Sequence, residues 1–351
     1  MSSWLSVGWG AKTLLGMPLS TDILLPARSS RGNLGALISA LAKADGSDAP
    51  LRVSMAQMLF YEPVAICMLL ARLRHWSADQ GRSVEILLPP PGNPVVGYMA
   101  HMGFFEQVGV LAHGILPAKT PKETYCPIAL VDGSTSVEQV TLGLTKAASA
   151  KREVNDELAH LLGYAISELL LNARQHSRGE GFVMAQYYQT GLFQIAVADN
   201  GIGIRRSYLD CNSPIVRGRE GLDDAGWVEE AIVPESSSKV HLRSPFGEGP
   251  VNRGVGLTLC RSFAKECLGD FLLISHSGSL HHGFEKQGAP REPRAGLLGR
   301  PYLGVACGVS INPAAFGACN YTDFRRGVLR DLGLADSTTP LTGSDTLFES
   351  P

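Results

Sequence analysis

A long amphipathic helix is predicted from Asn155 to His176, where apolar residues recur at spacings of three and four. The residues of this apolar stripe are Leu158, Leu161, Leu162, Ala165, Ile166, Leu169, Leu170 and Ala173. Glu168, Asn172 and His176 add polar side chains four residues apart, so they lie along nearly one line of the helix surface. Taken alone, this line is either the partly exposed polar edge of a core helix or a set of ligands that faces a site.

A strand that ends in an aspartate and two glycines follows this helix. The segments FVMAQYY and LFQIAVAD are predicted as the two strands of a hairpin, and the second strand leads into Asp199, Gly201 and Gly203. Glycines at such a turn let a ligand approach the backbone closely, and an aspartate there can accept a hydrogen bond from the amino group of a base. By itself, this spacing is more often a plain turn.

A second pair of glycines precedes the next predicted helix. In NRGVGLTLCRSF, Gly254 and Gly256 stand immediately before a helix that is predicted to end at Gly269. The N-terminus of a helix offers unpaired backbone amides and a partial positive charge, and both favour phosphate. Glycine before a helix is common, so this pattern is specific only in combination with the other two.

In this order, the three motifs resemble the ATP-binding domain of the GHKL, or Bergerat-fold, family, which includes histidine kinases, anti-sigma-factor kinases, DNA gyrase and mismatch-repair ATPases. The shared order is a helix with Glu-x-x-x-Asn, a hairpin, a strand ending in Asp-x-Gly-x-Gly, a long loop and Gly-x-Gly at a helix start. The resemblance covers about residues 150–312. It implies an α/β sandwich that binds ATP together with Mg²⁺.

The resemblance also implies a role for each matching residue. Glu168 would be the catalytic base, and Asn172 would hold the magnesium ion through its amide oxygen. Asp199 would bind the amino group of adenine. The remaining implied nucleotide contacts are Gly201 and Gly203 at the pocket floor, Gly254, Gly256 and Leu257 at the phosphates, and His176 at the edge of the phosphate region.

The segment from about Arg205 to Arg253 is predicted to be irregular and is too long for an ordinary connection, so it is either functional or disordered. The resemblance implies that it is a mobile lid over the nucleotide. Lys239, Arg243 and Arg253 are the candidate phosphate contacts of this lid. Within it, IVPESSSK resembles a Gly-x-Ser-Ser-Lys pattern of related signalling ATPases, with Glu235 in the place of the glycine.

The first half of the chain is predicted to contain a strand, a helix and a second strand. The strands are PLRVSMAQMLF and SVEILLP, and the helix runs from Glu62 to Gln80 with Pro63 in its first turn. A shorter helix that ends near Gly103 and then a strand start are expected next. Residues 30–115 resemble a STAS domain, the fold of anti-anti-sigma factors, and would form a regulatory module. The alternative is an unrelated α/β domain that extends the core.

The predicted fold class is therefore α/β with two domains. We expect an N-terminal segment at residues 1–29, the STAS-like domain at 30–115, the ATP-binding domain at 127–312 with its lid at 205–253, and a partly disordered tail at 313–351. The stretch HGILPAKTPKETYCP marks the boundary between the halves. The strands DFLLISHS and YLGVACGVSIN complete the second domain, and the helix DFRRGVLRDLG is expected early in the tail.

Composition and charge argue against several classes of protein. With 31 basic and 33 acidic residues the formal net charge is −2, so no global charge attracts the chain to nucleic acid or to an anionic membrane. No apolar run predicts a membrane span, and the first thirty residues lack a secretory pattern, so a cytoplasmic location is expected. The seven scattered cysteines form no CxxC pair, which predicts reduced thiols rather than zinc ligands or disulfides.

These patterns predict a signalling protein that hydrolyses Mg-ATP slowly or transfers its phosphoryl group to a serine or threonine of another protein. The alternative is a conformational switch that closes on ATP and recruits a protein partner without turnover. A DNA-processing ATPase is a third interpretation, which the lack of a basic excess disfavours. A protein partner or protein substrate is expected, and a homodimer remains open.

Phosphorylation of the chain's own histidines is not expected. His160 lies on the same predicted helix as Glu168 and is followed by leucine rather than by an acidic residue. His281 and His282 stand between predicted strands, where a solvated loop is expected.

Overall fold

Most of the chain folds into strands and helices, which range from two-residue strands to the 21-residue helix α6. The structure, a computed structural model, describes residues 20–109, 125–149, 154–234, 236–238, 256–284, 294–316, 324 and 326–327. The strands are β1 (Thr21–Leu24), β2 (Arg28–Ser29), β3 (Leu51–Ser54), β4 (Phe60–Tyr61), β5 (Val84–Leu87), β6 (Tyr125–Val131), β7 (Gly181–Tyr187), β8 (Phe193–Asp199), β9 (Asp270–Gly283) and β10 (Arg294–Ile311). The helices are α1 (Gly35–Leu41), α2 (Pro63–Arg74), α3 (Pro94–His101), α4 (Phe104–Val108), α5 (Val137–Ser149), α6 (Asp156–His176), α7 (Gly203–Asp210), α8 (Asp224–Glu230) and α9 (Gly256–Glu266).

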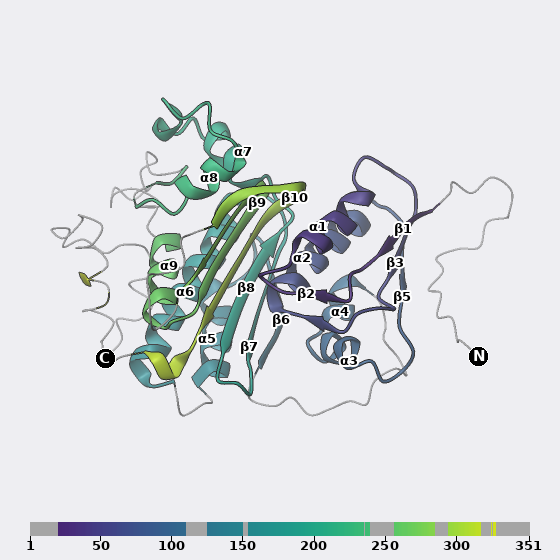
Figure 1. The fold of residues 1–351 in the computed structure, drawn as a ribbon, viewed down its shortest axis with the longest axis horizontal. Helices are drawn as coiled ribbons and strands as arrows, with labels where there is room; N and C mark the ends of the chain where they lie inside the picture. The colour runs from purple at the N-terminus through teal and green to yellow at the C-terminus, as the bar shows by residue number, and fades with distance from the viewer. Residues whose placement is uncertain are drawn as a thin grey trace, which may run out of the picture.

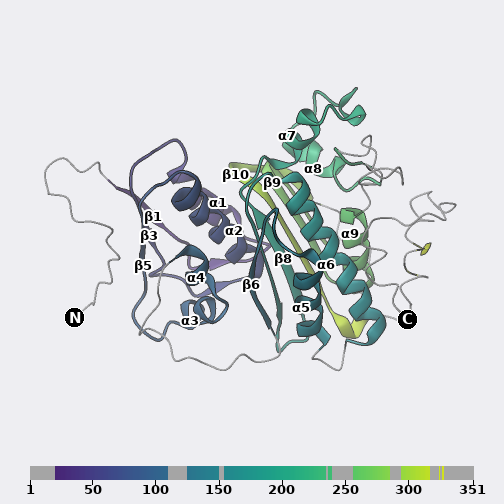
Figure 2. The ribbon, with the colours of Figure 1, turned by 180° about the vertical axis from the view of Figure 1, so that it is seen from behind.

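Two sheets of different design organise these elements. In the first half, β1, β3 and β5 form a parallel sheet in the order β1-β3-β5, and β2 pairs separately with β4. In the second half, a sheet of antiparallel strands runs in the order β6-β7-β8-β10-β9. Helices α1 and α2 lie between the two sheets (Figure 1). Figure 2 shows α5, α6 and α9 on the opposite face of the antiparallel sheet.

The helix predicted from Asn155 to His176 is confirmed as α6. It begins where the Asn155 side chain accepts a hydrogen bond from the backbone N–H of Leu158, which satisfies one of the unpaired amides of the first turn. Its apolar stripe is buried against the sheet and against α5 and α9. The predicted hairpin is also confirmed, because β7 and β8 pair antiparallel with Gly181 opposite Asp199.

Both faces of the antiparallel sheet are buried, and alternate residues of its strands enter different cores. On β7, Phe182 and Met184 join the core that contains the first half of the chain, whereas Val183 and Ala185 join the core that contains α6. On β8, Ala196 and Ala198 face the first core. A strand covered on both sides reads as a continuous apolar run, and this accounts for the sequence of both strands.

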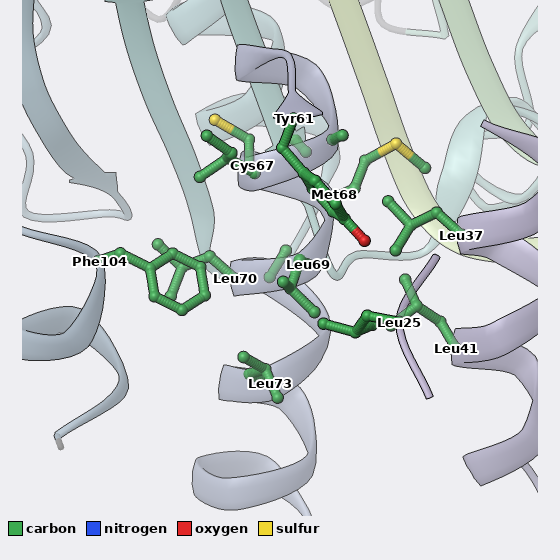
Figure 3. Packing of buried hydrophobic residues seen from close by; sticks show 14 of the residues in the cluster. Leu25, Leu37, Leu41, Tyr61, Cys67, Met68, Leu69, Leu70, Leu73 and Phe104 are labelled. Atoms are coloured by element: carbon green, nitrogen blue, oxygen red, sulfur yellow. The ribbon is translucent and has the colours of Figure 1, made fainter. Parts of the chain in front are cut away.

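The first half of the chain packs on the sheet mainly through α2. Pro63 occupies the first turn of this helix as predicted, but the α-helix ends at Arg74 and continues as a π-helical turn, His75–Asp79, rather than as regular helix to Gln80. Residues of α2 point in several directions at once: Met68 toward α1, Leu70 toward Phe104 of α4 (Figure 3). The helix lies at the centre of a core, which explains why it is apolar on nearly all sides.

This packing joins the two halves into one hydrophobic cluster, which contains α2 residues together with Phe182, Ala196 and Tyr302 of the antiparallel sheet. Such a shared core is the arrangement expected if the first half extends the core of the second. The STAS-like assignment and the domain boundaries stay predictions.

Three local predictions were wrong. After Gly103, whose φ of 78° ends α3, the chain forms the helix α4 instead of a strand, and it buries Phe104. The described part of the predicted irregular lid contains α7 and α8, because the Asp223 side chain caps α8 at the N–H of Gly226 and Trp227 becomes buried. His281 and His282 belong to β9 and not to a loop.

Some predictions fall outside the described residues. They concern the N-terminal segment up to residue 19, the boundary stretch 110–124 and nearly all of the tail after residue 316, including most of the predicted helix DFRRGVLRDLG. Among the helices that the structure describes, none combines the length and apolarity that a membrane crossing requires.

The shared core predicts that a cavity in α2 destabilises the antiparallel sheet as well. Leu70 is fully buried, so Leu70→Ala should lower the free energy of unfolding by about 2–5 kcal/mol. Hydrogen exchange measured by mass spectrometry should show lost protection in β7 and β8 as well as in α2. Leu142→Ala is the control, because Leu142 on α5 is 68% exposed. Faster exchange confined to residues 20–109 would contradict the shared core.

Candidate functional site

An open cleft of about 790 Å³ lies where α6, α7, the start of α9 and the antiparallel sheet meet. Its walls combine apolar side chains with a few polar ones, as is usual for small-molecule sites. The lining residues are Leu169, Asn172, Ala173, His176, Ser177, Val197, Asp199, Gly203, Ile204, Ser207, Tyr208, Ala231, Ser236, Ser237, Ser238, Gly256, Leu257, Leu273, Val305 and Cys307. The three sequence motifs, which are up to about ninety residues apart in the chain, thus contribute to one cavity.

Asp199 is the buried carboxylate of this cleft. It is the last residue of β8 and is 4% exposed. Its Oδ1 accepts hydrogen bonds from the backbone N–H groups of Gly201 at 2.8 Å and Val305 at 3.1 Å. Its Oδ2 accepts none from the described residues, so this oxygen is available to a ligand that donates a hydrogen bond. Burial raises the pKa of Asp199 to about 7, although the two N–H donors act in the opposite direction.

Gly201 and Gly203, the two glycines after Asp199, have different structural roles. Gly203 lines the cleft and begins α7 with a φ of 77°, a backbone conformation that residues other than glycine rarely adopt. Gly201, which we expected at the pocket floor, does not line the cleft. A Cβ on Gly201 would lie 2.1 Å from the carbonyl oxygen of Ser177, so this glycine lets the turn pack against the end of α6.

Strand β10 completes the surroundings of Asp199 through residues that sequence reasoning missed. The register of β10 against β9 shifts on both sides of Tyr302. Within the second of these shifts, Gly304 has a φ of 113°, and a Cβ there would lie 2.0 Å from the carbonyl oxygen of Asp199. The hydroxyl of Tyr302 donates to the same carbonyl oxygen at 3.1 Å. A glycine inside a predicted strand, as in YLGVACG, is the signal that could have indicated a bulge with a close backbone approach.

The polar line of α6 divides between the cleft and the protein interior. Asn172 and His176 line the cleft, and the Asn172 amide makes no hydrogen bond within the described residues. Glu168 is 3% exposed and does not line the cleft. It packs against the start of α9, since a Cβ on Gly256 would lie 2.1 Å from its Oε2.

The serine run of the predicted lid forms part of the cleft wall. Ser236, Ser237 and Ser238 are buried and line the cavity. The Ser238 hydroxyl lies 3.0 Å from Nδ1 of His176, and the Ser236 hydroxyl donates to Glu230 at 2.8 Å. The serine-rich pattern noted in the sequence therefore fixes this segment against α6 and α8. Glu235 and the candidate phosphate contacts Lys239, Arg243 and Arg253 lie outside the described residues.

The second glycine motif is described only in part. Gly256 and Leu257, at the start of α9, line the cleft, whereas Gly254 lies outside the described residues. Among the described residues, no three His, Cys, Asp or Glu side chains cluster as a metal site. The amide oxygen of Asn172 is one ligand that this cleft offers to a hard cation. The described cysteines are unpaired thiols, and Cys307 lies in the cleft wall.

Comparison with known families supports the interpretation of this cleft. Residues 157–288 match the model of the family "Histidine kinase-, DNA gyrase B-, and HSP90-like ATPase". The matched segment begins in α6 and ends just after β9, so it contains Glu168, Asn172, Asp199 and the start of α9. Comparison with curated proteins gave no match, and comparison with solved structures gave none either.

The family match supports an ATP-binding domain in the second half of the chain, and the antiparallel sheet with helices α5, α6 and α9 on one face fits its α/β sandwich. Residues 20–109 lie outside the matched segment, and so does β10 with Tyr302, Gly304 and Val305. The surroundings of Asp199 are thus built partly from residues that the family comparison does not cover.

The close approach at Gly304 predicts that a single methyl group disturbs the cleft. Gly304→Ala should weaken ATP binding at least about tenfold, because the methyl group strikes the backbone of Asp199 in a conformation that alanine disfavours. Isothermal titration calorimetry measures the affinity. Gly296→Ala on the same strand is the matched control, since a Cβ there meets no atom within 4 Å. Equal affinities of the two variants would show that the bulge does not shape the site.

The raised pKa of Asp199 predicts a pH-dependent cost of folding. The folded protein holds this proton more tightly than the unfolded chain does, so stability from Asp199 is present at low pH and is lost as pH rises toward about 7. Asp199→Asn should therefore become more stable relative to the wild type between pH 5 and pH 7, by up to about 1.4 kcal/mol per pH unit. Urea unfolding without nucleotide, with the exposed Asp48→Asn as control, measures the difference. A difference independent of pH would contradict the burial of an isolated carboxyl group.

Proposed function

We propose that this protein binds Mg-ATP in the cleft and either hydrolyses it slowly or transfers its phosphoryl group to a serine or threonine of a protein substrate. The observation that carries the proposal is the pairing of two polar groups across one cavity. Asp199 offers a buried carboxylate oxygen at the floor, and Asn172 offers an amide without a protein partner among the described residues. The family match over this segment supports the same assignment.

The base would lie on the sheet side of the cleft. Oδ2 of Asp199 would accept a hydrogen bond from the amino group of adenine, and Oδ1 is already held by two backbone N–H groups. The surrounding wall is apolar and suits a flat aromatic ring, because Ile204, Leu273 and Val305 line it. A base with an oxygen in place of the amino group would present an acceptor to the ionised carboxylate and would bind less well.

The phosphates would lie toward α6 and the start of α9. Gly256 and Leu257 line the cleft at the first turn of this helix, where a partial positive charge favours anions. Asn172 would hold Mg²⁺ through its amide oxygen, with the remaining ligands supplied by phosphate and water, and the ion would neutralise charge on the phosphates. His176 would lie at the edge of this region, with Nδ1 close to the hydroxyls of Ser207 and Ser238.

Glu168 is the proposed catalytic base. Its carboxylate lies buried beside Gly256 rather than in the cleft wall, so a water molecule or substrate hydroxyl would reach it only after a change at the start of α9. This position also favours the second candidate function, a switch in which ATP changes the conformation near α9 and recruits a protein partner without turnover.

Transfer to the chain's own histidines has little support. His160 is a half-buried residue within α6. His282 is 4% exposed and stacks on Phe284 with ring centroids 4.1 Å apart. Burial lowers the pKa of His282 to about 4, and nearby Arg261 acts in the same direction. We therefore look for the phosphoacceptor on a partner, and we retain the cytoplasmic location and a homodimer as expectations.

Radiolabelled ATP distinguishes the candidate functions. The purified protein is incubated with Mg²⁺ and γ-labelled ATP, alone and with cell extract, and free phosphate and labelled proteins are measured. For an enzyme, we expect Glu168→Gln to lower product formation at least about a hundredfold, as for loss of a general base, while ATP still binds. Asn172→Ala should lose the part of the ATP affinity that depends on Mg²⁺.

The control variant is Glu229→Gln, which changes an exposed glutamate of α8 and should leave product formation unchanged. Tight binding of ATP with no product from the wild type would favour the switch. No binding of ATP by the wild type would contradict both candidate functions.

A further inference from the structure

The end of the cleft that contains Asp199 is contacted from both faces of the sheet, including the face that points away from the cleft. Tyr302 and Val305 both belong to β10 and both contact Asp199, but they lie on opposite sides of the sheet. Val305 lines the cleft, and its N–H donates to Oδ1 of Asp199. Tyr302 is 1% exposed within the core that contains the first half of the chain, and its hydroxyl donates to the backbone oxygen of Asp199.

The hydroxyl of Tyr302 is the side-chain donor in this arrangement. Burial raises the pKa of Tyr302 well above its ordinary value, so the group remains a neutral donor. The irregular register of β10 on both sides of Tyr302 lets one short segment reach Asp199 from two directions. Gly304 lies between the two contacts and permits the close approach of the backbones.

The first half of the chain surrounds the ring of Tyr302. Arg72 of α2 is close enough to the phenol to act on its pKa, and Cys67 of α2 belongs to the same hydrophobic cluster as Tyr302. Arg72 is itself fixed by an ion pair with Asp45 and by stacking over Trp76, with 5.0 Å from its guanidinium carbon to the ring centroid. The position of the Tyr302 hydroxyl thus depends on packing outside residues 157–288, the segment that matches the ATPase family.

A second contact ties the same turn to the first half of the chain. Asn200, which directly follows Asp199, donates from Nδ2 to Oδ2 of Asp79 at 3.0 Å, and Asp79 ends the π-helical turn after α2. Arg74 forms a bidentate pair with Glu180, next to the start of β7, at 2.9 and 3.1 Å. The turn that carries Asp199 is therefore fixed at several points by the first half, and π-helical turns of this kind often occur at functional sites.

We propose that Tyr302 is a positioning residue for base recognition: its hydroxyl, placed by α2, holds Asp199 so that the carboxylate meets the amino group of adenine. This inference rests on the proposed function. It makes the first half of the chain part of the nucleotide site rather than a separate module. Without the hydroxyl, Asp199 would occupy more positions, and binding would have to order it.

The test compares ATP with inosine triphosphate, which carries an oxygen in place of the amino group. Affinities of the full chain for both nucleotides are measured by calorimetry for the wild type and for Tyr302→Phe. We expect the wild type to prefer ATP, and we expect Tyr302→Phe to lose about tenfold in ATP affinity while the affinity for inosine triphosphate changes less than about twofold. A purely structural loss would lower both affinities alike.

The matched control is Tyr61→Phe. Tyr61 is also a buried tyrosine whose hydroxyl donates to a backbone oxygen, that of Pro26 at 2.8 Å, but it lies in the first half away from the cleft. This variant should keep the preference of the wild type. An unchanged ratio of affinities in Tyr302→Phe, or no preference in the wild type, would overturn the inference while ATP binding stands. Binding of neither nucleotide by the wild type would instead refute the proposed function.

Discussion

Burial of both faces of the antiparallel sheet is the constraint on which the rest of the structure depends. One face carries α5, α6 and α9, and the other carries α1 and α2 of the first half. Because successive residues of a strand point to opposite faces, β7 and β8 supply side chains to both cores at once. A strand in this position can shift only if both cores repack, which keeps the end of β8 in place.

Asp199 stands at that end, and its surroundings follow from this constraint. An isolated buried carboxyl group is costly, and two backbone N–H groups offset the cost only in part, as the raised pKa indicates. The cleft thus carries a buried carboxyl group with a raised pKa, and such groups concentrate at ligand sites. Residues of β10 on the side of the first half also act on Asp199: the Tyr302 hydroxyl donates to its backbone oxygen, and Gly304 leaves space for that oxygen.

Regular elements with a clear hydrophobic period could be predicted from the sequence. The spacing of apolar residues in α6 and the apolar runs on either side of the hairpin turn predicted elements that the structure confirms. Asn172, Asp199 and Gly256, three residues of the family pattern, line one cleft. The irregular features could not be predicted in this way. The core shared with the first half depends on contacts between residues far apart in the chain, such as α2 with β8. A hydrophobic period predicts that a face is buried, but it does not predict which element covers that face. The burial of Glu168 behind Gly256 depends on how α9 approaches α6, which is likewise a tertiary property.

The most direct measurement of the central claim is a crystal structure of the full chain with Mg²⁺ and a non-hydrolysable ATP analogue. The account predicts the base against Val305 and Ile204, with its amino group within hydrogen-bond distance of Oδ2 of Asp199, and the phosphates between Asn172 and the start of α9. A nucleotide bound elsewhere, or a base turned away from Asp199 in this cleft, would contradict it.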